Sequence, residues 1–430
     1  MLTAIKGNIL EALSLDTLGV HPHSYLVLED GRVAGIYPTL PETMAEAQVT
    51  DFGDALILQS FSDMHLHGPQ YEYMGTGMDR PLLEWLEAYA FPTEARYADP
   101  AYAREKYRTL AHDLIQNGTT RVCMFSSRHT DGTLILMEEL EKAGITGYVG
   151  KVNMDRDAPD YLRETTEESQ KETLRWLEGC KGFTKVKPIL TPRFAPSCTD
   201  ELLAFLGKLK AEKDLPVQSH LSENLGEIAL VAELFPDCGQ YWEVYDKYGL
   251  FDSRTLMAHC VHSDDRERAA MLRKGVRPVH CASSNNSLMS GISPVADMLR
   301  EGQAICLGSD VSGGTTLSML RTMANSISAA KDRGSMTRDY DQAISIEQAY
   351  YMATSAGQTF FGLGPGFPEG ELLHAIVLDD TGLPKLPNLT LRDRLLRAAY
   401  RLDDRHITAV YSEGIRRRKK RMNEDKSVHP

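Results

Sequence analysis

Residues 60–67 read SFSDMHLH and come shortly after the apolar run at 57–58. The two histidines, His65 and His67, are spaced i and i+2, and side chains at this spacing on an extended strand point to the same side. Both imidazoles can then bind one cation. An H-x-H pattern alone has little specificity, so its meaning depends on whether other metal ligands converge on it.

The middle of the chain alternates short apolar runs with longer amphipathic stretches, a pattern typical of repeated βα units and a parallel sheet. Eight runs are predicted to be strands: 57–58, 122–125, 147–152, 186–190, 217–219, 256–258, 276–279 and 304–307. The stretches 133–143, 200–213 and 264–274 are long enough for crossover helices. Eight such strands can close into a barrel. The sequence therefore predicts an α/β fold, with a TIM-like (β/α)8 barrel over residues 61–364.

The two ends of the chain have a different pattern. Residues 1–60 contain alternating runs such as 25–28 and 33–36, on either side of the turn residues Asp30 and Gly31. After Gly364, strand-like runs at 375–378 and 407–411 flank a helical pattern at 391–401. We expect residues 1–60 and 365–430 to form one small composite β domain of sandwich-like form.

Potential metal ligands recur just after the apolar runs. In a barrel of this kind the carboxyl ends of the strands meet at one face, where the active site lies. The residues at these ends, from the fifth run onward, are His220 with Glu223, then His259, His280 and Asp310. A lone histidine is more often a structural side chain than a ligand. Five histidines and an aspartate at one end of a predicted barrel favour a shared metal site.

Composition restricts the partners and the compartment. A formal charge of −13 opposes binding to phosphate backbones, so no nucleic acid partner is expected. The basic run at 416–421 is predicted to be a solvated tail, with an anion-binding patch or a targeting signal as the alternatives. The sequence has neither a secretion-signal pattern nor an apolar window of about eighteen residues, so we expect no membrane partner. Seven scattered cysteines without C-x-x-C spacing are typical of reduced thiols in the cytoplasm.

Several longer segments carry a family resemblance. In matching order, SFSDMHLH, QSHLSENLGE, MAHCVH, VHCASSNNSL and GSDVSGG resemble the metal-site motifs of the amidohydrolase superfamily. Within it, HLHGPQY, PLLEWLEAYAFPTEARY, GKVNMDRDAPDYLRETTEES, VKPILTPRF and SMLRTM are most similar to the guanine deaminase family. The similarity covers nearly the whole chain. It departs at Gln59-Ser60, where the family usually has Pro-Gly, and at His374, where an acidic residue is common; neither departure touches the expected site.

The resemblance implies a metal centre. It assigns one zinc ion (Zn2+) to His65, His67, His220 and Asp310, and such a cation lowers the pKa of a bound water toward neutrality. Binuclear relatives use a carboxylated lysine at the end of the fourth strand. Here that strand ends as LTPRF at 190–194, so one metal ion is expected. Fe2+ suits the same histidine and carboxylate ligands.

The resemblance also implies the reaction, the hydrolytic deamination of guanine to xanthine and ammonia by a zinc-activated water. Proton transfer requires a base toward the water and an acid toward the ring and the leaving ammonia. By resemblance, Asp310 is the base and Glu223 carries protons to the ring. His259 orients and polarises the attacking water.

Substrate recognition is implied for three further residues. Gln70 and Arg193 would bind the polar edge of the purine, since buried hydrogen bonds discriminate better than apolar shape. Phe194 would form a wall against the ring. A surface salt bridge is the alternative role for Arg193, and Trp85 is equally well interpreted as pocket wall or core. His280 and the Ser284-Asn285 pair are expected at least as much to orient ligands as to act directly.

Two other hypotheses remain. The same fold and metal suit another purine, a pterin or a triazine ring, although the proposed substrate residues favour guanine. A barrel without catalysis could act as an assembly scaffold, yet every ligand and proton-transfer position is filled. No phosphate loop, dinucleotide fingerprint or nucleophile elbow occurs, nor the motif pair of the other zinc deaminase fold. The resemblance further implies a homodimer acting on a small-molecule purine.

Overall fold

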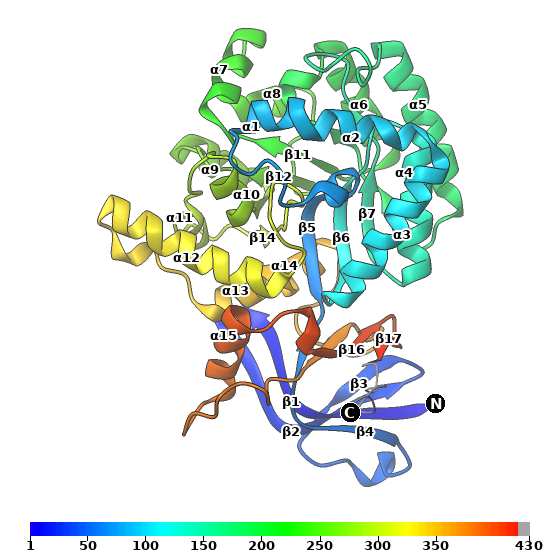
Figure 1. Cartoon of the computed structure of the whole chain (residues 1–430), viewed down its shortest axis with the longest axis vertical. Helices are drawn as coiled ribbons and strands as arrows, with labels where there is room; N and C mark the ends of the chain where they lie inside the picture. Colours follow the sequence, from blue (N-terminus) through cyan, green and yellow to red (C-terminus); the bar gives the residue numbers. More distant parts are fainter. Residues whose placement is uncertain (420–430) are drawn as a thin grey trace, which may run out of the picture.

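The computed structural model describes residues 1–419 and contains two structural regions. Figure 1 shows a larger region of alternating strands and helices above a sheet that combines both ends of the chain. Among the described residues, no helix has the length and apolar character needed to span a membrane.

Eight parallel strands form the centre of the larger region. They make two four-stranded sheets, in the orders β5-β6-β7-β9 and β11-β12-β13-β14. Their bounds are Phe61–His67, Thr119–Phe125, Thr146–Gly150, Val186–Pro188, Val217–Leu221, Thr255–His259, Arg277–His280 and Cys306–Leu307. A short pair, β8 (Val152–Asn153) with β10 (Thr191–Pro192), follows β7 and β9 along the chain.

Backbone hydrogen bonds connect the two sheets on both sides. Between β9 and β11, the amide of Leu190 donates to the carbonyl of Pro216 at 2.9 Å. Between β14 and β5, the amide of Asp310 donates to the carbonyl of His65 at 2.8 Å. The arrangement is therefore TIM-barrel-like, with parallel strands in the predicted order. The continuous closed sheet that the sequence predicts is not what the strand pairing shows.

The prediction for the first barrel strand is wrong. The apolar run at 57–58 lies in β4 (Gln48–Gln59), which belongs to the sheet formed by the chain ends. The first strand of the barrel-like region is β5, so His65 and His67 lie within this strand and not after it. All seven residues of β5 are buried. Strand β5 was not predicted because its polar residues interrupt any apolar run.

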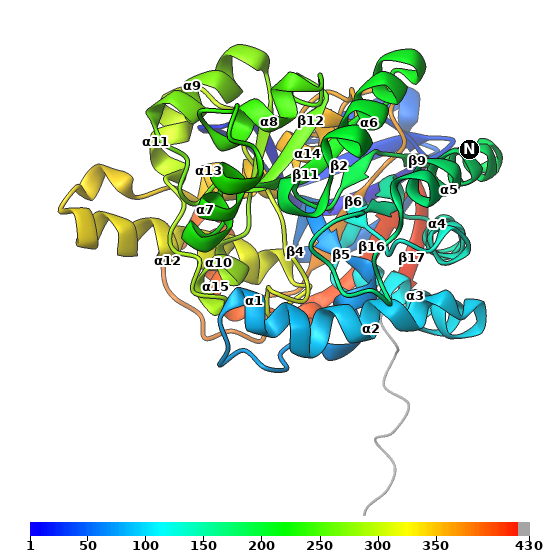
Figure 2. The same ribbon diagram turned by 90° about the horizontal axis from the view of Figure 1, so that it is seen from above.

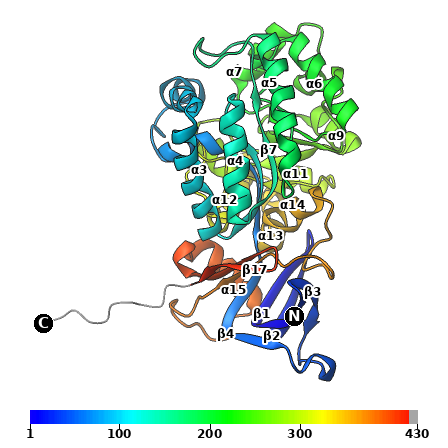
Figure 3. The same ribbon diagram turned by 90° about the vertical axis from the view of Figure 1, so that its right-hand side faces the viewer.

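Helices connect the parallel strands and cover them. Figure 3 shows α3, α4 and α5 on the outer surface, and Figure 2 shows α1 and α2 as one rod along one side. The helices are α1 Leu82–Trp85, α2 Phe91–Ala95, α3 Pro100–Gln116, α4 Thr130–Ala143, α5 Thr166–Gly179, α6 Asp200–Lys213, α7 Leu225–Leu234, α8 Tyr241–Lys247, α9 Asp265–Lys274, α10 Ala282–Ser287, α11 Val295–Arg300, α12 Met319–Thr337, α13 Ile346–Ala353, α14 Ser355–Phe360 and α15 Leu391–Arg401. A π-helical turn at Leu86–Ala90 joins α1 to α2.

Local capping explains why predicted helix bounds agree with the structure. The side chain of Thr199 accepts a hydrogen bond from the amide of Leu202 and begins α6, and the left-handed residue Asp214 ends it. Thr390 caps α15 in the same way, by accepting from the amide of Asp393. The predicted helices at 200–213 and 391–401 are both confirmed.

Seven strands from the two chain ends form one mixed sheet, in the order β17-β16-β15-β4-β1-β2-β3. The bounds outside β4 are β1 Leu2–Ser14, β2 Thr17–Glu29, β3 Arg32–Tyr37, β15 Ala375–Leu378, β16 Ile407–Ser412 and β17 Ile415–Lys419. Strand β4 pairs in parallel with β1 and antiparallel with β15, which joins the N-terminal strands to the C-terminal ones. A single sheet is observed where the sequence predicts a sandwich-like form.

The basic run at 416–421 begins inside this sheet. Residues 416–419 belong to β17, so the prediction of a solvated tail is wrong for them. A guanidinium N–H of Arg418 donates to the carbonyl of Gln116, and Arg417 lies 3.8 Å from the carboxylate of Glu413. Lys420 and Arg421 lie outside the described residues.

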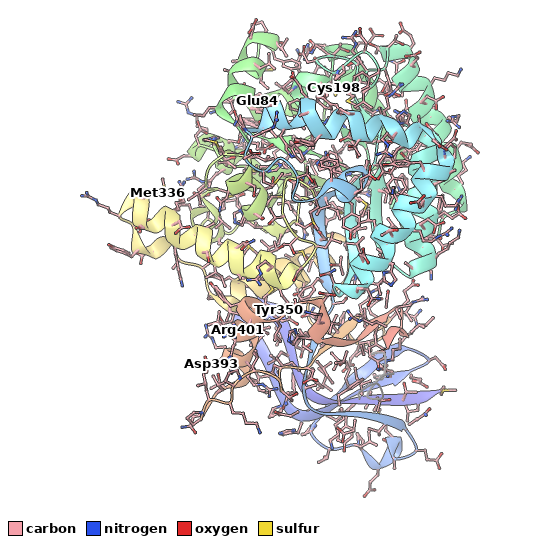
Figure 4. The ribbon with its side chains drawn as sticks, in the orientation of Figure 1. Glu84, Cys198, Met336, Tyr350, Asp393 and Arg401 are labelled. Atoms are coloured by element: carbon pink, nitrogen blue, oxygen red, sulfur yellow. The ribbon has the colours of Figure 1, made fainter. Side chains whose placement is uncertain are left out.

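Tyr350 joins the two regions at their junction (Figure 4). Its hydroxyl accepts from the amide of Gln59 at 2.9 Å and donates to the carbonyl of Leu10 at 3.2 Å. The side-chain amide of Gln59 donates to Ser355 Oγ at 2.9 Å, and its oxygen accepts from the amide of Ala12 at 2.7 Å. Gln59, one of the departures from the family pattern, is therefore a buried polar link between the terminal sheet and the helices beneath the barrel.

Candidate active site

Four potential ligands and one further histidine converge at the carboxyl ends of the parallel strands. His65 Nε2 lies 3.2 Å from Asp310 Oδ1, and His67 Nε2 lies 3.6 Å from the same oxygen. His67 Nε2 and His220 Nε2 are 3.2 Å apart. The ligand atoms of two triplets, His65-His220-His259 and His65-His67-Asp310, lie within 4.8 Å of one another. Each of the four predicted ligands therefore has a ligand atom within 4.8 Å of those of at least two others.

These spacings fit a small cation. Ligand atoms about 2.0–2.1 Å from a tetrahedral zinc ion are separated by about 3.3 Å. Burial lowers the pKa of His65, and it lowers those of His67 and His220 far below the usual value. Burial thus favours the neutral imidazole, which is the form that binds metals. In addition, His65 Nε2 is buried and has no hydrogen-bond partner within residues 1–419. The nitrogen and oxygen donors thus suit a divalent metal ion.

A second group of residues has the properties needed for proton transfer. His259 Nε2 lies 3.5 Å from Glu223 Oε2 and 3.8 Å from Asp310 Oδ2. His259 Nδ1 donates to Asn285 Oδ1 at 2.9 Å, and Ser290 Oγ donates to Glu223 Oε1 at 3.0 Å. The two carboxylates thus approach the same nitrogen, Nε2, of one oriented imidazole.

The two carboxylates differ in their pKa. Burial raises the pKa of Glu223. Burial also raises that of Asp310, but the adjacent imidazoles, His65 foremost, outweigh it and hold the pKa far below the usual range. Two carboxyl groups with opposite shifts are a mark of acid and base assignments in enzymes. Glu223 is therefore the better suited of the two to hold a proton, and Asp310 is ionised.

The backbone at these strand ends adopts an unusual conformation. His259 has a φ of 73°, Asp310 of 47° and Ser222 of 48°, all in the left-handed region. Non-glycine residues rarely occupy this region, which costs on the order of 1–3 kcal/mol per residue and is frequent at active sites. At His259 and Asp310 the strained backbone thus carries a side chain of the common centre, whereas the hydroxyl of Ser222 donates to Glu267.

A pocket opens beside the ligands. Its polar wall includes Gln70 and Arg193, the two polar residues predicted to bind the substrate. The other polar residues of the wall are His67, His220, Glu223, Glu227, His259 and Asp310. Its remaining wall consists of Leu82, Trp85, Leu86, Phe194, Leu288 and Gly313. The pocket thus combines three potential metal ligands, His67, His220 and Asp310, with an apolar wall, one amide and one guanidinium group.

Comparison with known proteins identifies the family to which the chain belongs. A sequence model described as the Amidohydrolase family matches residues 56–414. The chain belongs to the amidohydrolase family. The guanine deaminase of Dictyostelium discoideum is 34% identical over 435 residues, which cover 95% of this amidohydrolase and 96% of the relative. The guanine deaminase of Rattus norvegicus is 36% identical over 367 residues, or 82% and 80% of the two chains.

A solved structure shares the fold of this amidohydrolase. The crystal structure of guanine deaminase from C. acetobutylicum, with guanine bound in the active site, superposes with a TM-score of 0.93 at 42% identity. The match covers 97% of this amidohydrolase and 100% of that chain. The predicted family is thereby confirmed.

The structure shows where three residues lie whose roles the sequence left open. Arg193 is buried and lines the pocket, so the alternative of a surface salt bridge is wrong. Trp85 both lines the pocket and is 2% exposed, with its Nε1 donating to the carbonyl of Thr76 at 3.0 Å. His280 is buried but does not line the pocket, and burial lowers its pKa to about 4.

Two buried carboxylates, Glu94 and Glu227, were not identified from the sequence. Glu94 accepts hydrogen bonds from Arg193 and Gln70. Glu227 Oε2 accepts from the amide of Glu223 at 3.0 Å. A capping-box pattern, asparagine followed three residues later by glutamate at 224–227, could have identified Glu227. No spacing rule singles out Glu94, which lies in the quoted segment PLLEWLEAYAFPTEARY.

Proposed function

We propose that this amidohydrolase catalyses the hydrolytic deamination of guanine to xanthine and ammonia. The observation that carries the proposal is that the metal-ligand cluster and the pocket share His67, His220 and Asp310, with Glu223 beside them. The bound guanine of the C. acetobutylicum relative and the guanine deaminase names of the curated relatives support the choice of substrate.

His65, His67, His220 and Asp310 are the residues that would hold the metal. Zinc is the proposed ion, and Fe2+ suits the same ligands. When bound, zinc supplies hydroxide near neutral pH. The ligand carboxylate Asp310 is ionised and keeps its second oxygen, Oδ2, toward His259. We assign the role of base toward the attacking water to this oxygen.

Glu223 is proposed to move protons to the substrate. Burial raises its pKa, which favours the protonated carboxyl, and Ser290 donates a hydrogen bond to one of its oxygens. His259 has the opposite balance: burial lowers its pKa, but Glu223 and Asp310 together raise it above the usual value. An N–H at His259 Nε2 can thus orient the attacking water, while Asn285 holds Nδ1.

Gln70, Arg193 and Phe194 are proposed to bind the purine. Arg193 offers only donors, and Gln70 offers both a donor and an acceptor. Together they match the mixed polar edge of guanine, and Phe194 supplies an apolar face for the ring. A ring that lacks this edge leaves buried polar groups without partners, which is costly.

The proposal is tested by ammonia release from guanine, 8-oxoguanine, adenine, cytosine, a pterin and a triazine, with metal content measured on the same protein. One metal ion per chain and a strong preference for guanine are expected. A preference for another ring would overturn the substrate assignment. Protein without stoichiometric metal and without turnover would favour the scaffold hypothesis instead.

We further propose a cytoplasmic homodimer, without nucleic acid or membrane partners, in which residues 1–60 and 365–430 form one composite domain beside the barrel domain at 61–364. All seven cysteines lie within the described residues and are free, which agrees with a reducing compartment. Light scattering on the purified protein tests the dimer.

A further inference from the structure

Glu94 on α2 is a buried carboxylate behind the pocket. Its side chain is 1% exposed and does not line the cavity. Its oxygens accept three hydrogen bonds, from Arg193 Nη1 at 2.6 Å, from Arg193 Nη2 at 3.0 Å and from Gln70 Nε2 at 2.9 Å. All three donor nitrogens belong to residues that we propose to bind the purine. A single carboxylate thus contacts both polar substrate-binding side chains.

The contact between Glu94 and Arg193 fixes the plane of the guanidinium group. Two parallel N–H bonds to one carboxylate define the orientation of a guanidinium better than a single bond does. The Arg193 guanidinium carbon also lies 5.2 Å from the ring centroid of Phe91, which is on the same short helix. Helix α2 therefore holds Arg193 by a charged group and an aromatic face, and leaves its other N–H groups for the pocket.

The contact between Glu94 and Gln70 fixes which end of the Gln70 amide is the donor toward Glu94. An ionised carboxylate only accepts hydrogen bonds, so the amide nitrogen of Gln70 must face Glu94. The amide oxygen is then directed elsewhere, and it lies 3.4 Å from the backbone nitrogen of Ser312. The reversed amide would set its oxygen against the Glu94 carboxylate. Glu94 therefore determines on which side Gln70 offers a donor and on which side an acceptor.

We propose that Glu94 is a positioning residue that sets the hydrogen-bonding polarity of the purine subsite, and thereby selects a ring with a carbonyl at C6. This inference rests on the proposed guanine deamination. A ring with an amine at C6, such as 2,6-diaminopurine, keeps the leaving amine at C2 but presents donors to the donor-only Arg193. Because Glu94 holds Arg193 in place and Gln70 in one orientation, neither side chain can move aside or turn an acceptor toward this amine. The opposed donors then lose their hydrogen bonds, and the ring is rejected.

The test compares Glu94→Gln with a matched control, Glu164→Gln. Glu164 is also buried and bonds a buried cation, Lys151 Nζ, at 2.8 and 3.0 Å. Steady-state kinetics with guanine and with 2,6-diaminopurine, metal content and thermal unfolding are measured for wild type and both variants.

In Glu94→Gln, KM for guanine should rise about ten-fold or more and kcat should change by less than about three-fold, with metal content unchanged. The preference for guanine over 2,6-diaminopurine should fall by at least about ten-fold. Glu164→Gln should unfold at a lower temperature with the same KM and preference as wild type. A shared loss of stability therefore does not reproduce the expected change.

The outcomes separate the two proposals. If the wild type does not deaminate guanine, the proposed function fails, and this inference with it. If the wild type is active and Glu94→Gln keeps its KM and its preference, only the role of Glu94 is overturned. Should Glu94→Gln not fold, Glu94→Asp keeps the charge but withdraws the carboxylate by one methylene. It must then show the same fall in preference, and an unchanged preference there overturns the inference.

Discussion

The carbonyl oxygen of Arg193 lies 2.5 Å from Nδ1 of His220, which donates a hydrogen bond to it. This bond places the proton of the neutral imidazole on Nδ1 and leaves the Nε2 lone pair free for a cation. The guanidinium of the same residue lines the substrate pocket. One residue thus orients a metal ligand with its main chain and contacts the substrate space with its side chain.

Substitution of Glu223 should separate catalysis from metal binding. Glu223→Gln removes the group that holds a proton near the ring, so kcat should fall by about 10²–10⁴-fold with metal content unchanged. His65→Ala removes a buried ligand and should lose both metal and turnover. Kinetics and metal analysis on the same samples check this. Near-normal kcat in Glu223→Gln would show that another group transfers the proton.

Asn285 should affect the reaction through His259. Asn285→Leu removes the acceptor for Nδ1 of His259, so kcat should fall by about 10–100-fold while the metal stays bound. Asn285→Asp keeps an oxygen there and should retain more activity. Asn286→Leu, at an exposed position on the same helix, is the control. Equal kcat values for both leucine variants would refute an orienting role.

Glu267 should make the protein less stable as pH rises. Burial raises its pKa to about 7 against a usual 4.5, although the hydroxyls of Ser263 and Ser222 donate to it. Between these two values the folded protein binds more protons than the unfolded chain, so the free energy of unfolding falls with increasing pH. The loss for this group is on the order of 3 kcal/mol over that window.

Denaturant unfolding from pH 5 to pH 8 measures this effect. Glu267→Gln does not titrate, so its stability should decline less than that of wild type over this range. Glu212→Gln changes an exposed carboxylate and should keep the wild-type slope. Parallel curves for wild type and Glu267→Gln would contradict the prediction.

Removal of the metal should lower the melting temperature as well as the activity. The proposed ligands come from β5, β11 and the loop after β14, so a bound ion links segments that are far apart in the chain. A ligand at about a thousand times its Kd contributes roughly 4 kcal/mol to the folded state. Chelation should therefore reduce Tm and turnover, and added zinc should restore both. In His65→Ala, chelation should leave Tm unchanged; an equal shift there would mean that the chelator acts elsewhere.

The convergence of the site could be predicted because it depends only on strand order. In parallel strands the carboxyl ends meet at one face, so His220, His259 and Asp310 approach one another whatever the details of pairing. The start of the barrel could not be found in this way. Strand β5 is buried throughout although it contains Ser62, Asp63 and two histidines. The two histidines face the site, and Asp63 accepts a hydrogen bond from the amide of Ser309.

Glu94 illustrates a different difficulty. It follows a π-helical turn, which interrupts the regular helical spacing between Trp85 and α2. Its partners, Gln70 and Arg193, are 24 and 99 residues away in the chain. Side-chain pairs of this kind depend on tertiary packing, so local pattern carries no signal for them.

Only Ser60 separates β4 from β5, the strand that carries the first two histidines. Because β4 pairs on one side with β15, which begins at Ala375, a ribosome must make most of the protein before this pairing can form. A nascent chain that already contains every proposed ligand therefore still lacks β15, one of the two strands that pair with β4. Metal capture and the arrival of the C-terminal strands are thus expected to be linked events during biosynthesis.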